Sequence, residues 1–126
     1  MKTNMRRTHS AFTLVEIMIV VAIIGLLAAL AVPGFMRARM QSQGRRIIND
    51  ARQMDAAVDQ WALEKGAANG STVDTVGAAT YLKRAWPIND LLNNAYVIGQ
   101  VGSTQIQIAA ATKTALTGVG IDWGSY

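Results

Sequence analysis

The sequence of 126 residues contains no cysteine and a single histidine. Without cysteine, the chain has no disulfide bond and offers no thiolate for nucleophilic chemistry or for a zinc site. The single histidine, His9, lies in the first eleven residues, so no histidine-based acid–base pair is expected in the rest of the chain. No other constellation of catalytic side chains is evident. We therefore expect a protein that is not an enzyme and has no cofactor.

Acidic residues are also scarce, with eight against twelve lysines and arginines, and the last third of the chain holds only Asp90 and Asp122. Two separated carboxylates are too few for the roughly six to eight oxygen ligands of a calcium ion, so no metal site is expected. The net charge of +4 does not indicate nucleic-acid binding, because three basic residues precede Phe12 and the rest of the chain is nearly balanced.

The chain does contain one long apolar run, residues 12–36, with the sequence FTLVEIMIVVAIIGLLAALAVPGFM. Twenty uncharged residues follow Glu16, enough for a helix to cross a bilayer core about 30 Å thick. Glu16 is the single charge in the run, and a carboxylate in such a segment costs roughly a few kcal/mol unless another group pairs with it. The preceding residues 1–11 form a basic leader without an acid.

Three interpretations of this N-terminus compete. A cleaved secretory signal would end after the small residues Ala29 and Ala31, but the apolar run continues beyond Ala31 and Glu16 is unusual in such a signal. A plain signal anchor fits the hydrophobicity, although arginines also flank the far side of the run, so the charge bias leaves its orientation open. The third interpretation rests on a family resemblance.

The stretch FTLVEIMIVVAIIGLLAALAVPGF after Ala11 resembles the N-terminus of type IV pilins and of the related pseudopilins of type II secretion. In that family, a prepilin peptidase cuts before a Phe that opens an FTLxE motif and then methylates the new amine. The resemblance, over about residues 6–35, implies cleavage between Ala11 and Phe12, N-methylation of Phe12, and a role for Glu16 in assembly. The leader departs from the family pattern in having Ala11 where Gly is usual.

The same resemblance assigns two positions that weaken the helix. Gly25 and Pro33 match the family's helix-weakening positions. Pro33 lacks a backbone donor and crowds the preceding turn, and Gly25 has low helix propensity. The stretch between them is where we expect the helix to kink, or to unwind when it packs with copies of itself.

The charge of Glu16 can be compensated in two ways. Cleavage before Phe12 creates an α-amine that is largely protonated at neutral pH. This cation can pair with the Glu16 carboxylate in an apolar core, where either charge alone would be costly. The pair is either intramolecular, since Phe12 and Glu16 are one helical turn apart, or formed between Glu16 of one subunit and Phe12 of its neighbour. In the second arrangement, processing controls assembly because the amine does not exist before cleavage.

After residue 36 the pattern is that of an amphipathic helix. Seven apolar or small residues recur at alternating intervals of four and three and predict the core-facing side of a helix. They are Met40, Gly44, Ile47, Ala51, Met54, Val58 and Trp61. The helix is expected to end near Lys65, where Gly66 supplies a C-terminal stop and Asn69-Gly70 a turn.

Beyond Gly66 the residues are small and favour strands, and this region is expected to cover the apolar stripe. The expected elements are a short helix within residues 73–82, strands at residues 96–101 and 105–109 around a Gly102-Ser103 turn, and a third strand within residues 115–120. The predicted fold class is α+β and pilin-like. It consists of a long N-terminal helix, with a transmembrane half and an amphipathic half, packed against a small antiparallel sheet.

Charge along the second half of the helix is uneven. Four arginines are followed by four acids, in the order Arg37, Arg39, Arg45, Arg46, Asp50, Asp55, Asp59 and Glu64. Asp55 and Asp59 are interpreted as ordinary solvated acids. Two arrangements stay open for the array. Staggered copies pair a basic segment with a neighbour's acidic one, or the arginines lie at the outer headgroups with the acids in water.

The sequence thus predicts a basic leader (residues 1–11), a transmembrane or filament-core helix (residues 12–36) and a small extracytoplasmic globular domain (residues 37–126) that includes the second half of the helix. The resemblance implies a subunit of a type IV pilus-like filament, anchored first in the inner membrane by a single pass with its C-terminal domain periplasmic. Its implied partners are copies of itself, prepilin peptidase and an inner-membrane assembly platform. The alternatives are a type II secretion pseudopilin and a membrane-anchored periplasmic binding protein that never polymerises.

Overall fold

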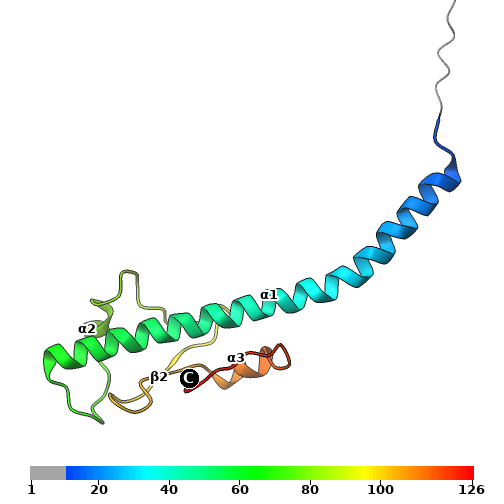
Figure 1. Cartoon of the computed structure of the whole chain (residues 1–126). Coiled ribbons are helices and arrows are strands. Elements are labelled where there is room, and N and C mark those ends of the chain that lie inside the picture. Colours follow the sequence, from blue (N-terminus) through cyan, green and yellow to red (C-terminus); the bar gives the residue numbers. More distant parts are fainter. Residues whose placement is uncertain (1–10) are drawn as a thin grey trace, which may run out of the picture. The chain divides into compact units, whose positions relative to one another are not determined.

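The computed structural model describes residues 11–126, so His9 and nearly all of the predicted leader lie outside the described residues. The elements in chain order are α1 (Leu14–Lys65), α2 (Thr75–Ala79), β1 (Val97–Ile98), β2 (Ile106–Gln107) and α3 (Ala110–Ala115) (Figure 1). The chain divides into two compact units, Met1–Met36 and Arg37–Tyr126, and helix α1 contributes to both.

In the first unit, the chain is helical from Leu14 onward without interruption. The helix continues through Gly25 and Pro33, and nothing lies within 4 Å of the position that a side chain at Gly25 would occupy. The large apolar side chains of this unit are exposed throughout. The predicted kink between Gly25 and Pro33, and the predicted unwinding in helices packed with their copies, both stay predictions.

The C-terminal end of α1 was predicted correctly. Lys65 is its last residue, and Gly66 follows with φ +64°, in the left-handed region that glycine adopts at low cost. The amide of Ala67 donates to the carbonyl of Ala62 at 2.9 Å and closes the helix end. Gly70 also has a positive φ, +87°, at the predicted turn.

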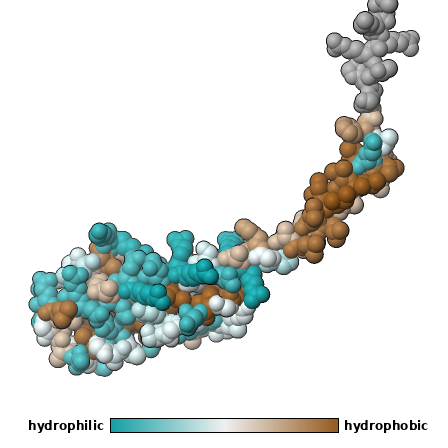
Figure 2. Space-filling model, viewed as in Figure 1, coloured by the Kyte–Doolittle hydropathy of each residue, from teal (hydrophilic) through white to brown (hydrophobic). Residues whose placement is uncertain are grey.

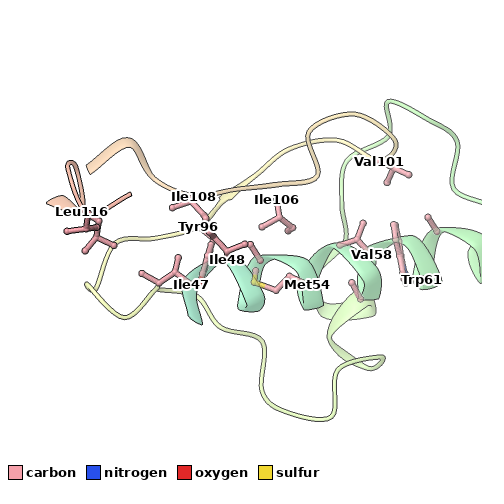
Figure 3. Close-up of a cluster of buried hydrophobic side chains, with 14 residues drawn as sticks. Ile47, Ile48, Met54, Val58, Trp61, Tyr96, Val101, Ile106, Ile108 and Leu116 are labelled. Carbon is pink, nitrogen blue, oxygen red and sulfur yellow. The ribbon is translucent and has the colours of Figure 1, made fainter. Parts of the chain in front are cut away.

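The core of the second unit lies between one side of α1 and the segments that follow it (Figure 3). Six of the seven residues of the predicted stripe are buried, and Met40, the seventh, is partly buried and packs against the core. Ile106 points toward α1 from β2, and Tyr96 and Leu116 belong to the same cluster. Each large apolar side chain buried in this way contributes roughly 1.5–3 kcal/mol, and the stripe supplies Ile47, Met54, Val58 and Trp61 to this core.

The sheet confirms the predicted α+β class, although its strands are shorter than expected. β1 and β2 pair antiparallel, with Val97 opposite Gln107 and Ile98 opposite Ile106. The first strand stops early because the backbone of Val101 bonds to another segment. Its carbonyl accepts from the Gly70 amide at 2.8 Å, and its amide donates to the carbonyl at position 71.

The third strand predicted within residues 115–120 is wrong. Helix α3 occupies the preceding residues and ends at Ala115. Gly118 and Gly120 then adopt φ values of +82° and +74°, which are incompatible with an extended strand. The short helix predicted within residues 73–82 is confirmed as α2, and Asp74 caps it by accepting a hydrogen bond from the Val76 amide at 3.0 Å.

Asp55 is not the ordinary solvated acid that was predicted. It is half-buried, and its Oδ1 atom is buried with no hydrogen-bond partner among the described residues. Burial raises the pKa of the Asp55 carboxyl; the Tyr126 hydroxyl opposes this rise and the Asp59 charge adds to it. The interpretation is wrong for Asp55 because the last residue of the chain lies beside this turn of α1, whereas Asp59 is exposed.

Replacing Asp55 with asparagine is expected to raise the free energy of unfolding at pH 7. A folded-state pKa above the unfolded value means that the native state binds the proton more tightly. The stability that this provides is present at acid pH and is lost as the pH rises through the raised pKa. Urea unfolding of the full chain in mild detergent, followed by tryptophan fluorescence, should therefore show a larger gain for Asp55→Asn at pH 7 than at pH 3.5.

The exposed Asp59 offers a matched control on the same helix, and Asp59→Asn should change stability clearly less. A loss of stability for Asp55→Asn at pH 7, or an equal gain at both pH values, would contradict the assigned cause.

Candidate functional site

The predicted cleavage site lies just before α1, in a segment without regular secondary structure. Ala11, Phe12 and Thr13 are all exposed, and the Phe12 side chain is 83% exposed. The peptide bond between Ala11 and Phe12 is therefore outside the helix. A protease requires such an accessible, non-helical bond, and the local structure provides it.

Glu16 lies in the first turn of α1, where it forms a reciprocal pair of hydrogen bonds with Thr13. The Thr13 amide donates to Glu16 Oε2 at 2.7 Å, and the Glu16 amide donates to Thr13 Oγ1 at 3.3 Å. This is a capping box, in which Thr13 is the N-cap residue and Glu16 the third helical residue. Two amides that the helix would leave without partners are thereby satisfied.

The structure thus brings Glu16 together with Thr13, a residue that the sequence analysis did not single out. The signal was present in the sequence, because T-x-x-E before an apolar run is the pattern of a capping box. Removal of the residues before Phe12 leaves the Thr13 amide unchanged, so the reciprocal pair is compatible with cleavage.

The capping box engages only part of the Glu16 carboxylate. Oε2 accepts the Thr13 amide, and Oε1 has no hydrogen-bond partner among residues 11–126. An ionised carboxylate has about four acceptor positions on its two oxygens. Glu16 can therefore accept from a further cationic donor while it still caps its own helix.

The rest of the first unit offers apolar contact and little else. Figure 2 shows a predominantly hydrophobic surface over this part of α1. The most apolar stretch of 18 residues in the helix has a mean hydropathy of 2.9, and none of these residues is buried. Helix α1 is the one helix in the described chain long and apolar enough to cross a membrane. Within residues 12–36, Thr13 and Glu16 are the only polar side chains, so they alone can supply polar specificity.

The two acids of the C-terminal third are engaged by their own chain. Asp90 is buried and accepts from the amides of Leu92 and Asn94, and Asp122 accepts from the Gly124 amide at 3.0 Å. Among the described residues, no three His, Cys, Asp or Glu side chains are grouped so that they could hold a metal ion.

Comparison with known proteins relates the chain to one group. The family model of the prokaryotic N-terminal methylation motif matches residues 6–32. The chain is 42% identical over 60 residues to the type IV major fimbrial protein FimA of Dichelobacter nodosus. This match covers 48% of this chain and 38% of that protein. It is 30% identical over 110 residues to the fimbrial protein EcpC of Eikenella corrodens, covering 87% of this chain and 67% of that relative.

A second kind of relative has a secretion name. The chain is 44% identical over 59 residues to the type II secretion system core protein G of Pseudomonas aeruginosa, covering 47% of this chain and 42% of that protein. The matches to FimA and to this protein span less than half of the relative's length. No solved structure matches the chain.

Proposed function

We propose, from the premise that the chain belongs to the family of type IV pilins and type II secretion pseudopilins, that it is a structural subunit of a type IV pilus-like filament. The family consists of structural subunits, and the chain is not an enzyme. One observation carries the proposal. The apolar half of α1 is exposed in the single chain, an exposed Phe12 precedes it, and the Glu16 carboxylate in its first turn still has acceptor capacity.

Processing is the first step of the proposed function. Prepilin peptidase cuts between Ala11 and Phe12 and methylates the Phe12 amine. The exposed, non-helical position of this bond supports the assignment. Methylation keeps the positive charge of the amine and adds a small apolar group, so the product remains a cation suited to an apolar core.

Assembly is the second step, and Glu16 directs it. The apolar helix moves from the bilayer into a core made of its own copies, a transfer between two apolar surroundings that hydrophobicity alone hardly favours. Aliphatic side chains slide past one another with weak register, so a polar pair has to fix the axial position. The unused Oε1 of Glu16 and the Phe12 amine of a neighbouring subunit form this pair.

The same reasoning sets the location and the partners. The precursor is a single-pass protein of the inner membrane with its C-terminal domain in the periplasm, and the finished filament is periplasmic or extracellular. The helix of Leu14–Lys65 is long and apolar enough to cross a membrane, which supports the anchor. Its partners are copies of the chain and an inner-membrane assembly platform. Gly25 and Pro33 weaken the helix, so that it kinks or unwinds between them when it packs with its copies.

A type II secretion pseudopilin is the second candidate. Its support is the similarity to the type II secretion core protein G of several organisms, between 34% and 44% identical over 59 residues. The two functions differ in the location of the filament, on the cell surface for a pilin and within the cell envelope for a pseudopilin. Shearing cells and purifying surface filaments separates them, because a pilin is recovered in that fraction, whereas a pseudopilin at its native level stays with the cell envelope.

The mature chain is expected to start at Phe12 with a methylated amine. Mass spectrometry of the N-terminal peptide, from protein isolated from its native membrane, measures this directly. An N-terminus at Val32 would indicate a conventional signal peptide, and one at Met1 an uncleaved anchor. Either result would overturn the proposed processing, and a strain without prepilin peptidase provides the matched control.

A further inference from the structure

A groove on the second unit brings two arginines together with polar side chains. Arg45 and Arg46 are both exposed on α1, whose buried stripe lies on another side of the helix. The groove has a volume of about 390 Å³ and is lined by Ala38, Gln41, Ser42, Arg45, Arg46 and Asn49. Guanidinium, amide and hydroxyl donors at one place are suited to the oxygens of a phosphate group.

Three of the four acids farther along α1 are already engaged inside their own subunit, and the fourth, Asp55, is half-buried. Asp50 pairs with Arg84 at 2.9 Å, Asp59 accepts from Gln105 Nε2 at 2.7 Å, and Glu64 accepts from the Tyr81 hydroxyl. These contacts lower the availability of the acids for the arginines of another copy. The second arrangement left open by the sequence, with the arginines at headgroups, is therefore favoured.

Arg45 and Arg46, by contrast, have no partner among residues 11–126. Neither side chain forms a hydrogen bond or an ion pair with the described part of the chain. Of the other arginines at this end of the helix, Arg37 donates to the Gly118 carbonyl at 3.3 Å. Within residues 11–126, two neighbouring cations of this groove thus lack an anionic partner.

The position of the pair along the helix brings it within reach of a membrane surface. Arg46 lies about 14 Å along α1 from Arg37, the first residue of the second unit, at 1.5 Å per residue. Helical side chains lean toward the N-terminal end of their helix, which for Arg45 and Arg46 is the direction of Arg37. The headgroup layer extends roughly 5–7 Å beyond the hydrocarbon core, and arginine readily extends to it.

We infer that Arg45 and Arg46 bind the phosphate headgroups of anionic phospholipids at the surface of the membrane that anchors the precursor. The inference rests on the proposed membrane anchor and adds a second, electrostatic contact to it. Anionic headgroups attract basic residues that lie close to a membrane surface. This contact holds the second unit at the bilayer until assembly replaces it.

Lipid selectivity of the full chain tests the inference. The chain is reconstituted into phosphatidylcholine bilayers with trace spin-labelled phosphatidylglycerol or phosphatidylcholine, and the motionally restricted fraction gives the relative association constant. The wild type should prefer phosphatidylglycerol. Arg45→Gln with Arg46→Gln should lower that preference by at least about fivefold, which is the effect of losing a single engaged arginine near an anionic surface.

Lys65→Gln with Lys83→Gln is the matched control, because it removes the same charge from two exposed residues outside the groove. This variant should keep the wild-type preference for phosphatidylglycerol. In both proteins, 1 M salt should weaken that preference through screening. An equal loss in both double variants, or no preference in the wild type, would overturn the inference.

Two further results have distinct meanings. Chemical cross-linking in the same vesicles measures contact between copies of the chain. If the arginine variant keeps its lipid preference but cross-links less than the wild type, the partner of Arg45 and Arg46 is an acidic segment of a second copy, and the inference is wrong. If the wild-type chain is released from the vesicles by alkaline carbonate, the membrane anchor itself fails, and the proposed function fails with it. The anchor and the headgroup contact are thus judged by separate measurements.

Discussion

Glu16→Ala is expected to leave membrane insertion and cleavage intact and to reduce incorporation into filaments at least tenfold. The lost interaction is a hydrogen bond between two charged groups in an apolar core, and such bonds contribute roughly 1.5–3 kcal/mol each. A loss of about 1.4 kcal/mol per contact already lowers an association constant tenfold. Each subunit makes this contact in the proposed filament, so the effect accumulates along the fibre.

The capping box complicates this result, because alanine removes both the charge and the cap. Glu16→Gln separates the two, since glutamine serves the capping box as well as glutamate does but carries no charge. Thr13→Ala is the reciprocal control. It removes the hydroxyl that accepts from the Glu16 amide and keeps the carboxylate. We expect Glu16→Gln to fail in assembly nearly as severely as Glu16→Ala, and Thr13→Ala to retain most of its filaments.

The reach of the side chain gives a third variant. Glu16→Asp keeps the charge but shortens the side chain by one methylene, so it should assemble at an intermediate level. All variants are expressed in cells that lack the wild-type chain, sheared filaments are quantified by immunoblot, and cleavage is verified by mass spectrometry. Normal filament levels from Glu16→Gln would mean that the carboxylate acts locally, as a helix cap, and that the intermolecular pair is dispensable.

Asp90→Ala is expected to lower the free energy of unfolding of the second unit by about 3 kcal/mol. The Asp90 carboxylate is only 8% exposed and holds together two parts of the chain. Its Oδ1 accepts from the amides of Leu92 and Asn94 at 2.8 and 3.0 Å, and its Oδ2 accepts from the fully buried Thr112 hydroxyl. Alanine leaves all three donors without their partner at a buried or partly buried site, and hydrogen bonds to a charged group are the stronger class.

Smaller changes separate the contributions of the individual hydrogen bonds to this loss of stability. Asp90→Asn keeps an oxygen for the two amides but places an amide group opposite Thr112, so its expected cost is about 1–2 kcal/mol. Thr112→Val has nearly the same shape as the wild type but removes the hydroxyl that also accepts from Asn94 Nδ2 at 2.9 Å. The two changes should be non-additive in a double-mutant cycle, because both remove the contact between the loop and α3.

Urea unfolding of the full chain in mild detergent, monitored by tryptophan fluorescence, measures each cost. The exposed Asp74, which caps α2 through the Val76 amide, is the comparison, and Asp74→Ala should lose only about 1 kcal/mol. A loss below about 1 kcal/mol for Asp90→Ala would show that this loop does not depend on its buried carboxylate.

Much of the fold followed from residues close together in the sequence. The stripe from Met40 to Trp61 was recognised because helical periodicity depends only on spacing, and the structure buries six of its seven members. The end of α1 at Lys65 was equally local, since Gly66 provides the required left-handed backbone. The two strands were found in the right places but were predicted too long. The end of the first depends on the segment near Gly70, which bonds to the backbone of Val101, and the second is followed closely by α3.

Part of the candidate site was also determined locally. The apolar run, its single acid Glu16 and the FTLxE motif were enough to propose cleavage before Phe12, and those assignments still await experiment. The capping box between Thr13 and Glu16 was encoded in four consecutive residues. The charge of Glu16 predicts a cationic partner, whereas the free amides of the helix start predict this cap, and the structure shows the cap.

By itself, the sequence determined what depends on spacing and composition, namely the apolar helix, its charge, its amphipathic continuation and its end. Only the tertiary structure decided which polar groups meet. Asp90 joins Thr112 across 22 positions, Asp50 pairs with Arg84, and Tyr126 lies beside Asp55. These contacts depend on the path of irregular loops, whose backbone angles no periodic pattern specifies. Among residues 11–126, Asp50 pairs with Arg84 and not with Arg45 or Arg46, which no count of charges along the helix could reveal.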